Sequence, residues 1–130
     1  AWHYRTVLLP KVATGPETYI AELELVQPAI FTEPDDQSAW MYHRWIMQQL
    51  APHHDADGVR GALEQELEQC LELWGEEDKC KWPLAAAVYI KGVLGYAPAD
   101  ISKDYDALVA LDPAHRRYYK YAQAQQAASA

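Results

Sequence analysis

The hydrophobic positions of the chain repeat with the spacing of an α-helix over most of its length. Ile20, Leu23, Val26 and Ile30 fall on one face of a helix, and a similar stripe runs through residues 63–74. No useful stretch alternates between apolar and polar residues, as a half-buried strand would. The pattern therefore predicts an all-α protein without a sheet.

Prolines and capping residues divide the first part of this pattern into helices. The first helix is expected to end at Pro10, because a proline cannot continue the hydrogen-bond ladder. Thr14 and Glu17 have the spacing of a capping box for the second helix. Pro28 lies inside that helix and is expected to kink it or to loosen one turn.

Acidic residues and further prolines mark the remaining helices. Asp35 or Asp36 is suited to cap a helix from Gln37 to about Leu50. The later helices are expected over residues 63–74, 83–94 and 101–111, and after a cap at Asp112 followed by Pro113.

The tryptophans reveal an internal repeat. Trp2, Trp40 and Trp82 recur at intervals of about 40 residues, and sliding one unit onto the next pairs Glu22 with Glu64. Each unit reads as an amphipathic helix, an acidic turn and a helix that opens near a tryptophan. This organisation predicts an α-α superhelix of antiparallel helix pairs, a TPR-like solenoid. We expect a single repeat domain with units near residues 1–10, 16–50 and 59–95 and with terminal helices over 100–127.

The most unusual segment is "SAWMYHRW", which partly repeats the opening "AWHYR". Its helix is apolar along three strips, more than one core contact requires, so some of its side chains are expected to serve a neighbouring repeat or a partner. Arg44 is a cation in this apolar setting and needs a carboxylate or carbonyl partner. The residues predicted to lie in the repeat core or at a partner interface are Trp2, Tyr4, Arg5, Trp40, Tyr42, His43, Arg44, Trp45 and Trp82.

Composition narrows the classes of function. A net charge of −8 argues against a nucleic-acid binder, and no apolar run reaches the length of about 20 residues needed to span a bilayer. The two cysteines do not form a CxxC pair and are expected to be free thiols in the cytoplasm. Because the chain opens without a methionine, we expect it to be part of a longer protein.

Direct signs of catalysis are weak. His53, His54, Asp55 and Asp57 lie together on a polar loop, which is expected to be solvated rather than to hold a metal. Cys70 falls on an apolar stripe and is expected to be a buried thiol. In "HRRYYK", Tyr118 or Tyr119 is expected to pack inward. No catalytic, cofactor-binding or metal-binding residue is assigned.

The repeated motif resembles a known family. "AWHYRTVLLP", "ELELVQPAIFTEPDDQSAWMYHRW", "DKCKWPL" and "ALDPAHRRYY" are similar to the repeats of protein prenyltransferase α-subunits, most of all those of the Rab-modifying type-2 geranylgeranyltransferases. The resemblance covers nearly the whole chain and is firmest over residues 1–50.

The resemblance implies a subunit that is active only with a partner. It implies an αβ heterodimer that transfers geranylgeranyl to C-terminal cysteines of Rab GTPases presented by a Rab escort protein. The catalytic zinc and the lipid pocket would belong to the β-subunit, so no cofactor is expected in this chain, and the chain alone would be inactive. Two alternatives stay open: a non-enzymatic helical-repeat adaptor, and the α-subunit shared by farnesyltransferase and type-1 geranylgeranyltransferase.

Overall fold

The computed structural model describes residues 2–76 and 79–128, and these residues form helices and no strand. The all-α prediction is confirmed. In chain order the helices are α1 (Trp2–Val12), α2 (Pro16–Thr32), α3 (Gln37–Leu50), the 3-10 helix η1 (Ala51–His53), α4 (Asp57–Glu76), α5 (Lys81–Val93), α6 (Pro98–Leu111), the 3-10 helix η2 (Pro113–His115) and α7 (Arg116–Ala128).

The chain divides into two compact units, residues 1–65 and residues 66–130. Helix α4 contributes to both, because the division falls inside it. The predicted organisation as a single repeat domain stays a prediction, and the two units are described separately.

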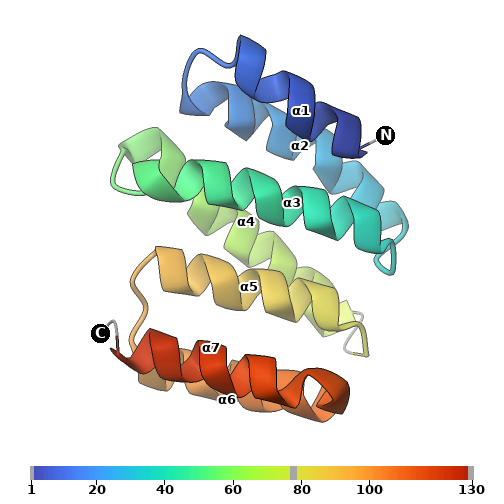
Figure 1. Ribbon diagram of the computed structural model, residues 1–130, viewed down its shortest axis with the longest axis vertical. Helices are drawn as coiled ribbons and strands as arrows, with labels where there is room; N and C mark the ends of the chain where they lie inside the picture. The colour runs from blue at the N-terminus through green and yellow to red at the C-terminus, as the bar shows by residue number, and fades with distance from the viewer. Residues whose placement is uncertain (1, 77–78, 129–130) are drawn as a thin grey trace. The chain divides into compact units, whose positions relative to one another are not determined.

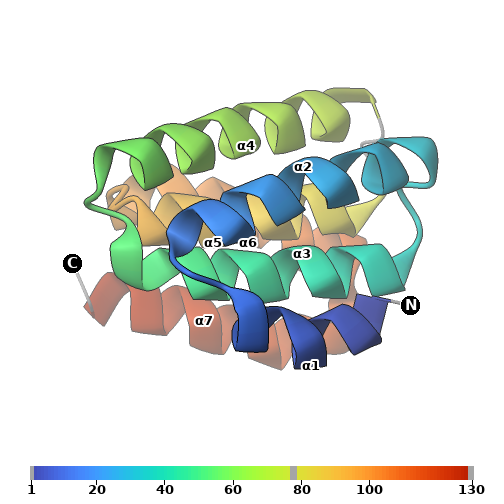
Figure 2. The same cartoon turned by 90° about the horizontal axis from the view of Figure 1, so that it is seen from above.

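In the first unit, α3 is the central helix. It contacts both α1 and α2 and lies between them in Figure 2. Helices α2 and α3 run antiparallel and are joined by a short turn (Figure 1). Each buries one apolar face, and burial of each large aliphatic side chain contributes about 1.5–3 kcal/mol. The buried apolar residues of this pair are Leu23, Val26, Ile30, Ala39, Trp40, Tyr42, Ile46, Met47 and Leu50.

The start of α3 is fixed by a cap and by a tryptophan. The carboxylate of Asp36 accepts hydrogen bonds from the backbone N–H groups of Ser38, at 3.0 Å, and Ala39, at 3.5 Å. The indole Nε1 of Trp40 donates to the carbonyl oxygen of Pro34 at 2.7 Å, which ties the helix to the preceding turn. The predicted cap and both predicted ends of α3 are confirmed.

Two boundary predictions in this unit are wrong. Helix α1 continues past Pro10 to Val12. A proline so close to a C-terminal end removes only one backbone donor, and Ala13 N–H still closes the last turn on the carbonyl of Leu9 at 2.9 Å. The predicted box at Thr14 does not form, because the N-cap of α2 is Gly15, which has no side chain to accept a hydrogen bond.

In the second unit, α6 contacts both α5 and α7, and α7 lies over α6 in Figure 1. Trp74 of α4 packs against the core of this unit. The core consists of Leu84, Val88, Ile101, Tyr105, Leu108 and Tyr119.

A glycine ends α5. Gly95 has φ of 83°, the left-handed region that side chains disfavour. Its N–H donates to the carbonyl of Gly92 at 3.2 Å, and Tyr96 N–H donates to the carbonyl of Lys91 at 3.0 Å. These two bonds form a Schellman motif, which satisfies carbonyl groups that the helix end leaves open.

Burial corrects the alignment of the repeat. The ungapped comparison pairs Glu22 with Glu64, yet the buried acids are Glu22 and Glu66, whereas Glu24 and Glu64 are exposed. Pairing Glu22 with Glu66 also superposes buried Leu23 on buried Leu67 and buried Val26 on buried Cys70. The residue of the second repeat that corresponds to Glu22 is therefore Glu66, two residues later than the alignment by identical residues indicated. That alignment could slip by two residues because both helices contain a Glu-x-Glu sequence.

Candidate partner-binding site

Three predicted residues form a stack of aromatic rings in the first unit. The ring of Trp2, on α1, stacks on Tyr42, on α3, with centroids 5.0 Å apart. Tyr42 also stacks on Trp45 at 5.7 Å, and Tyr19 of α2 meets Trp45 edge-on at 5.8 Å. The stack thus links all three helices of this unit.

A buried carboxylate lies behind the stack. Glu22 is 6% exposed and accepts a hydrogen bond from the hydroxyl of Tyr42 at 2.7 Å. Arg5 donates to the same carboxylate through Nε and, at 2.9 Å, through Nη2. A buried charge is costly unless it is paired and hydrogen-bonded, and these donors meet that requirement.

The shared network shifts the ionisation of its members. The hydrogen bonds from Arg5 hold the pKa of Glu22 below its ordinary value, against the opposing effect of burial. The bond to Glu22 raises the pKa of Arg5. Burial raises the pKa of Tyr42, and its bond to Glu22 adds to this. At neutral pH the network therefore consists of a carboxylate, a guanidinium and a neutral phenol.

An open hollow lies in front of the stack, between α1 and α3, with a volume of about 520 Å³. Its lining combines aromatic, aliphatic and cationic groups. Met41 is 61% exposed there, although it is a large apolar side chain. The lining includes Trp2, Met41, Tyr42, Arg44, Trp45 and Gln48.

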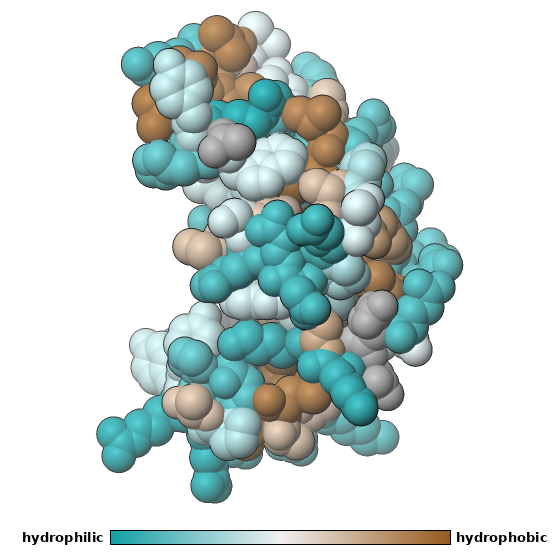
Figure 3. Space-filling view, turned by 90° about the vertical axis from the view of Figure 1, so that its right-hand side faces the viewer, coloured by the Kyte–Doolittle hydropathy of each residue, from teal (hydrophilic) through white to brown (hydrophobic). Residues whose placement is uncertain are grey.

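Other apolar side chains also reach the surface. On α1, Tyr4, Val7, Leu8 and Val12 are exposed at helical spacing. The face drawn in Figure 3 shows several apolar areas among hydrophilic ones. Leu25 and Phe31, both on α2, are 49% and 43% exposed. Single exposed apolar residues are ordinary on protein surfaces, whereas an aromatic hollow with a cation at its edge has the composition of a binding site.

The remaining predicted residues of the first unit divide between core and surface. Trp40 is buried, as predicted for the core, and meets the buried ring of His43 edge-on at 5.4 Å. Tyr4 is 66% exposed and outside the hollow's lining. Arg44 is half-buried and lines the hollow, so it borders solvent rather than lying in the apolar interior.

Trp82 differs from Trp40 in its environment. It is half-buried near the start of α5, and the ammonium nitrogen of Lys81 lies 4.8 Å from its ring centroid. Trp40 is the fourth residue of its helix and Trp82 the second. The predicted equivalence of these two tryptophans stays a prediction.

An ion cluster holds the second unit together at Asp112. Its carboxylate accepts hydrogen bonds from Lys81 at 2.6 Å and Tyr119 at 2.8 Å, and lies 2.9 Å from Nδ1 of His115. The bond from Lys81 is the main cause that lowers the pKa of Asp112. Asp112 occupies the predicted N-cap position, before the 3-10 helix η2 that leads into α7, but its side chain binds these partners and makes no side-chain cap bond.

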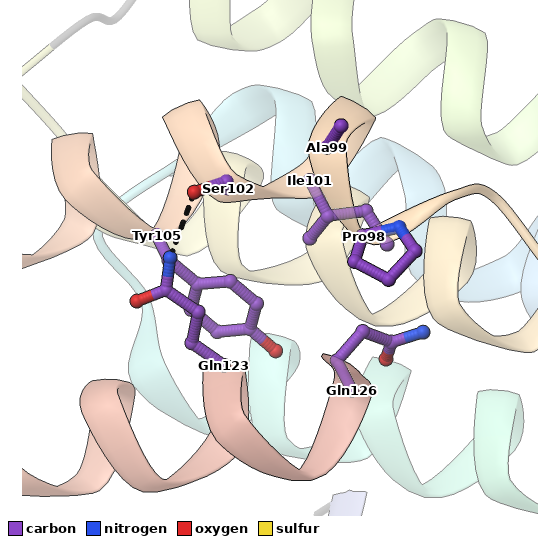
Figure 4. A pocket seen from close by; sticks show the side chains of 7 residues that line it. All are labelled: Pro98, Ala99, Ile101, Ser102, Tyr105, Gln123 and Gln126. Carbon is purple, nitrogen blue, oxygen red and sulfur yellow. Dashed lines mark hydrogen bonds between the residues drawn. The ribbon is translucent and has the colours of Figure 1, made fainter. Parts of the chain in front are cut away.

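A smaller pocket opens between α6 and α7, with a volume of about 220 Å³ (Figure 4). Ile101 and Tyr105 form its apolar wall, and Gln123 donates from Nε2 to Oγ of Ser102 at 2.9 Å. This bond occupies the polar groups on one side, so the pocket presents mainly an apolar surface.

The histidines and the cysteine considered as metal-binding or reactive groups lie in ordinary surroundings. His53 is exposed, and His54 lies 3.3 Å from Asp55, which is 93% exposed. Cys70 is a buried free thiol that donates to Glu66 at 3.8 Å, and burial holds its pKa well above the ordinary value. The prediction of a buried thiol is confirmed.

Sequence reasoning missed two contributors to the site. Glu22 was used only to align the repeat, although it binds both Arg5 and Tyr42. The available signal was its place beside Leu23 on the apolar stripe of α2, where an acid needs a partner. Met41 lies on one of the apolar strips of its helix, and nothing in the local pattern indicates that it is exposed at a hollow.

Comparisons with known proteins agree with this architecture. Residues 19–50, which cover most of α2 and all of α3, match the model of the protein prenyltransferase alpha subunit repeat. A geranylgeranyl transferase type-2 subunit alpha of Dictyostelium discoideum is 34% identical over 121 residues, covering 89% of this chain and 39% of that protein. The human protein of that name is 41% identical over 81 residues, 55% of this chain and 14% of its own length.

A third relative is less identical but also matches most of the chain. The geranylgeranyl transferase type-2 subunit alpha of Schizosaccharomyces pombe is 28% identical over 116 residues, covering 76% of this chain and 34% of that protein. The helical repeat and these matches show a protein that is like the alpha subunits of protein prenyltransferases. It is similar to type-2 geranylgeranyl transferase alpha subunits in particular, and it spans less than half the length of each of these relatives.

Proposed function

We propose that this chain forms part of the α-subunit of a protein geranylgeranyltransferase. In this role it scaffolds a catalytic β-subunit, and the heterodimer attaches geranylgeranyl to C-terminal cysteines of Rab GTPases presented by a Rab escort protein. The observation that carries the proposal is the similarity to a type-2 subunit alpha along 89% of the chain.

The hollow in front of Tyr42 supplies a surface for the partner. Its aromatic rings are already held in place by the stack and by the Glu22 network, so little side-chain entropy is lost when a partner covers them. Arg44 at the edge can pair with a partner's carboxylate. Aromatic residues and arginine are the side chains most enriched at interface hot spots.

The proposal includes a division of labour between the two subunits. We assign no residue of it to the transfer step, and we place the catalytic zinc and the lipid pocket in the β-subunit. None of the helices in the described ranges is both long and apolar enough to cross a bilayer. We place the complex in the cytoplasm, where its substrates are presented.

Co-expression with a type-2 β-subunit tests this proposal. The chain is tagged and purified alone, with the type-2 β-subunit and, as a control, with a farnesyltransferase β-subunit. The expected result is stable co-purification with the type-2 β-subunit, and zinc only in the complex.

Transfer to a Rab GTPase is then measured with geranylgeranyl diphosphate and escort protein present. Activity in the complex and none in the isolated chain supports the proposal. Preference for the farnesyltransferase β-subunit would favour the shared α-subunit instead. Failure to bind either β-subunit would favour a non-enzymatic adaptor.

A further inference from the structure

Helix α7 carries an exposed surface that combines positive charge with tyrosine rings. We call the residues of this surface the α7 basic face. Tyr118 is 58% exposed and Tyr121 is 65% exposed, whereas Tyr119 between them is buried in the core of the second unit. The α7 basic face consists of Arg116, Arg117, Tyr118, Lys120 and Tyr121, all of which are exposed.

Helical geometry places Arg117 and Tyr121 on the side of α7 opposite its packed side, with Arg116 and Lys120 on one flank and Tyr118 on the other. Tyr119 and Ala122 pack into the core, and Gln123 bonds to α6. Arg117 and Tyr121, four residues apart, lie on the opposite side of the helix. The basic face is therefore the outer surface of the helix rather than a by-product of its packing.

The positive charge of this face is only partly balanced within the described residues, although the whole chain carries a net charge of −8. Lys120 lies 3.7 Å from Asp106, and both side chains are largely exposed. Within residues 2–76 and 79–128, Arg116 and Arg117 have no carboxylate within ion-pair distance.

The arrangement also disfavours the helix that carries it. Arg116 and Arg117 lie in the first turn of α7, which contains no acidic residue, and cations there oppose the positive end of the helix dipole. Arg116 and Lys120 are four residues apart, a spacing at which like charges repel. Arg116 and Arg117 therefore do not stabilise the start of this helix, and a binding role explains them better.

We propose that the α7 basic face binds an acidic segment of a partner protein. The planar guanidinium groups of Arg116 and Arg117 pair with carboxylates in bidentate fashion. The rings of Tyr118 and Tyr121 take an apolar side chain of the same segment, and their hydroxyls remain available as donors. The proposal does not depend on the transferase role, because it concerns a different helix and a different ligand chemistry.

Charge distribution favours a short segment over a membrane or a nucleic acid. Screening limits each interaction to about 8–10 Å at physiological salt, so a narrow peptide experiences only the local positive face. An extended anionic bilayer or a long nucleic acid would also meet the acidic remainder of a chain with net charge −8.

Fluorescence anisotropy with two labelled peptides tests the proposal. One peptide repeats Glu-Glu-Tyr, and the other, its neutral counterpart, repeats Gln-Gln-Tyr. We expect the full chain to bind the acidic peptide and not the neutral one. The double substitution Arg116→Glu with Arg117→Glu should weaken binding by at least about tenfold.

Matched controls separate this face from general charge effects. The double substitution Lys11→Glu with Lys103→Glu changes the net charge of the chain by the same amount, at two exposed lysines outside the α7 basic face. It should weaken binding of the acidic peptide by less than about threefold. Tyr121→Ser should weaken binding, whereas Tyr4→Ser at an equally exposed position should not. Circular dichroism checks the folding of each variant. If the variant with glutamates at 116 and 117 unfolds, Arg116→Gln with Arg117→Gln replaces it.

Two results would overturn the proposal. Equal losses in the arginine and lysine double variants would show that only net charge matters. Binding of phosphatidylserine vesicles or of single-stranded DNA that requires Arg116 and Arg117, without binding of the acidic peptide, would assign the face to another class of ligand.

Discussion

At the scale of single residues, Glu22 joins two helices of the first unit to its own, because it binds both Arg5 and Tyr42. Replacing it with glutamine keeps its shape and removes its charge. We expect Glu22→Gln to lower the free energy of unfolding by about 1.5–3 kcal/mol, because charge-assisted hydrogen bonds to Arg5 and Tyr42 are weakened. Urea denaturation measures this loss.

The neighbouring acid provides the control. Glu24 is on the same helix and exposed, so Glu24→Gln should change the free energy of unfolding by less than about 0.5 kcal/mol. Equal effects of the two substitutions would show that the network contributes no stability beyond general charge.

The same carboxylate predicts a dependence of stability on pH. The pKa of Glu22 is lower in the folded protein than its ordinary value of about 4.3. The stabilisation it gives is therefore complete above that ordinary value and is lost as the pH falls through the lower, folded pKa. Asp112 contributes in the same direction, because its pKa is also lowered.

Denaturation midpoints measured between neutral pH and pH of about 3 test this expectation. The parent chain should lose stability on acidification, and Glu22→Gln should lose less, because its residue at 22 has no proton to gain. If Glu22→Gln loses stability on acidification as steeply as the parent chain does, the groups responsible for the pH dependence lie elsewhere.

At the scale of elements, Trp40 secures the start of α3 in two ways. Its ring is buried and its indole N–H bonds to Pro34. We expect Trp40→Ala to cost about 3–5 kcal/mol, as for a large core deletion. Trp40→Phe should cost less, since it keeps most of the buried ring. Met41→Ala, at an exposed position beside it, serves as the control; a large effect there would contradict the assignment of Trp40 as the anchor.

Two glycines offer a test of helix ends against helix interiors. Gly95→Ala should destabilise the chain by about 1 kcal/mol, because its φ of 83° suits only glycine. Gly61→Ala should stabilise it by up to about 1 kcal/mol, since it lies within α4 and an added Cβ meets nothing within 4 Å. Thermal melting would show opposite shifts; shifts of the same sign would refute the assignment of Gly95 as the helix terminator.

Elements were predictable from sequence where local chemistry decides them. The cap at Asp36 and the stripe of Leu23 and Val26 act within one helix, so α2 and α3 were recognised. The partnership of Arg5 with Glu22 was not, because it joins two helices and depends on how they pack. The exposure of Met41 was missed for the same reason.

At the scale of the whole molecule, the chain separates groups that hold its own fold from groups that it leaves exposed. Glu22, Tyr42 and Asp112 are satisfied internally. The hollow and the α7 basic face are exposed, and they differ in chemistry: one is aromatic and apolar with a cation at its edge, the other is basic. The two surfaces therefore offer different chemistry to any partner.

The last prediction distinguishes a partner-binding hollow from an ordinary surface. Met41→Asp introduces a charge into the hollow at a side chain that is 61% exposed, so folding should be retained. Desolvating that carboxylate against a partner is costly, and affinity for the β-subunit should fall by at least about tenfold.

Phe31→Asp makes the same change of charge at an exposed apolar residue of α2, outside the hollow, and should leave affinity within about threefold. Interferometry on immobilised β-subunit measures both variants, with melting temperatures recorded beside them. If Phe31→Asp weakens binding and Met41→Asp does not, the partner contacts α2, and the hollow is not its site.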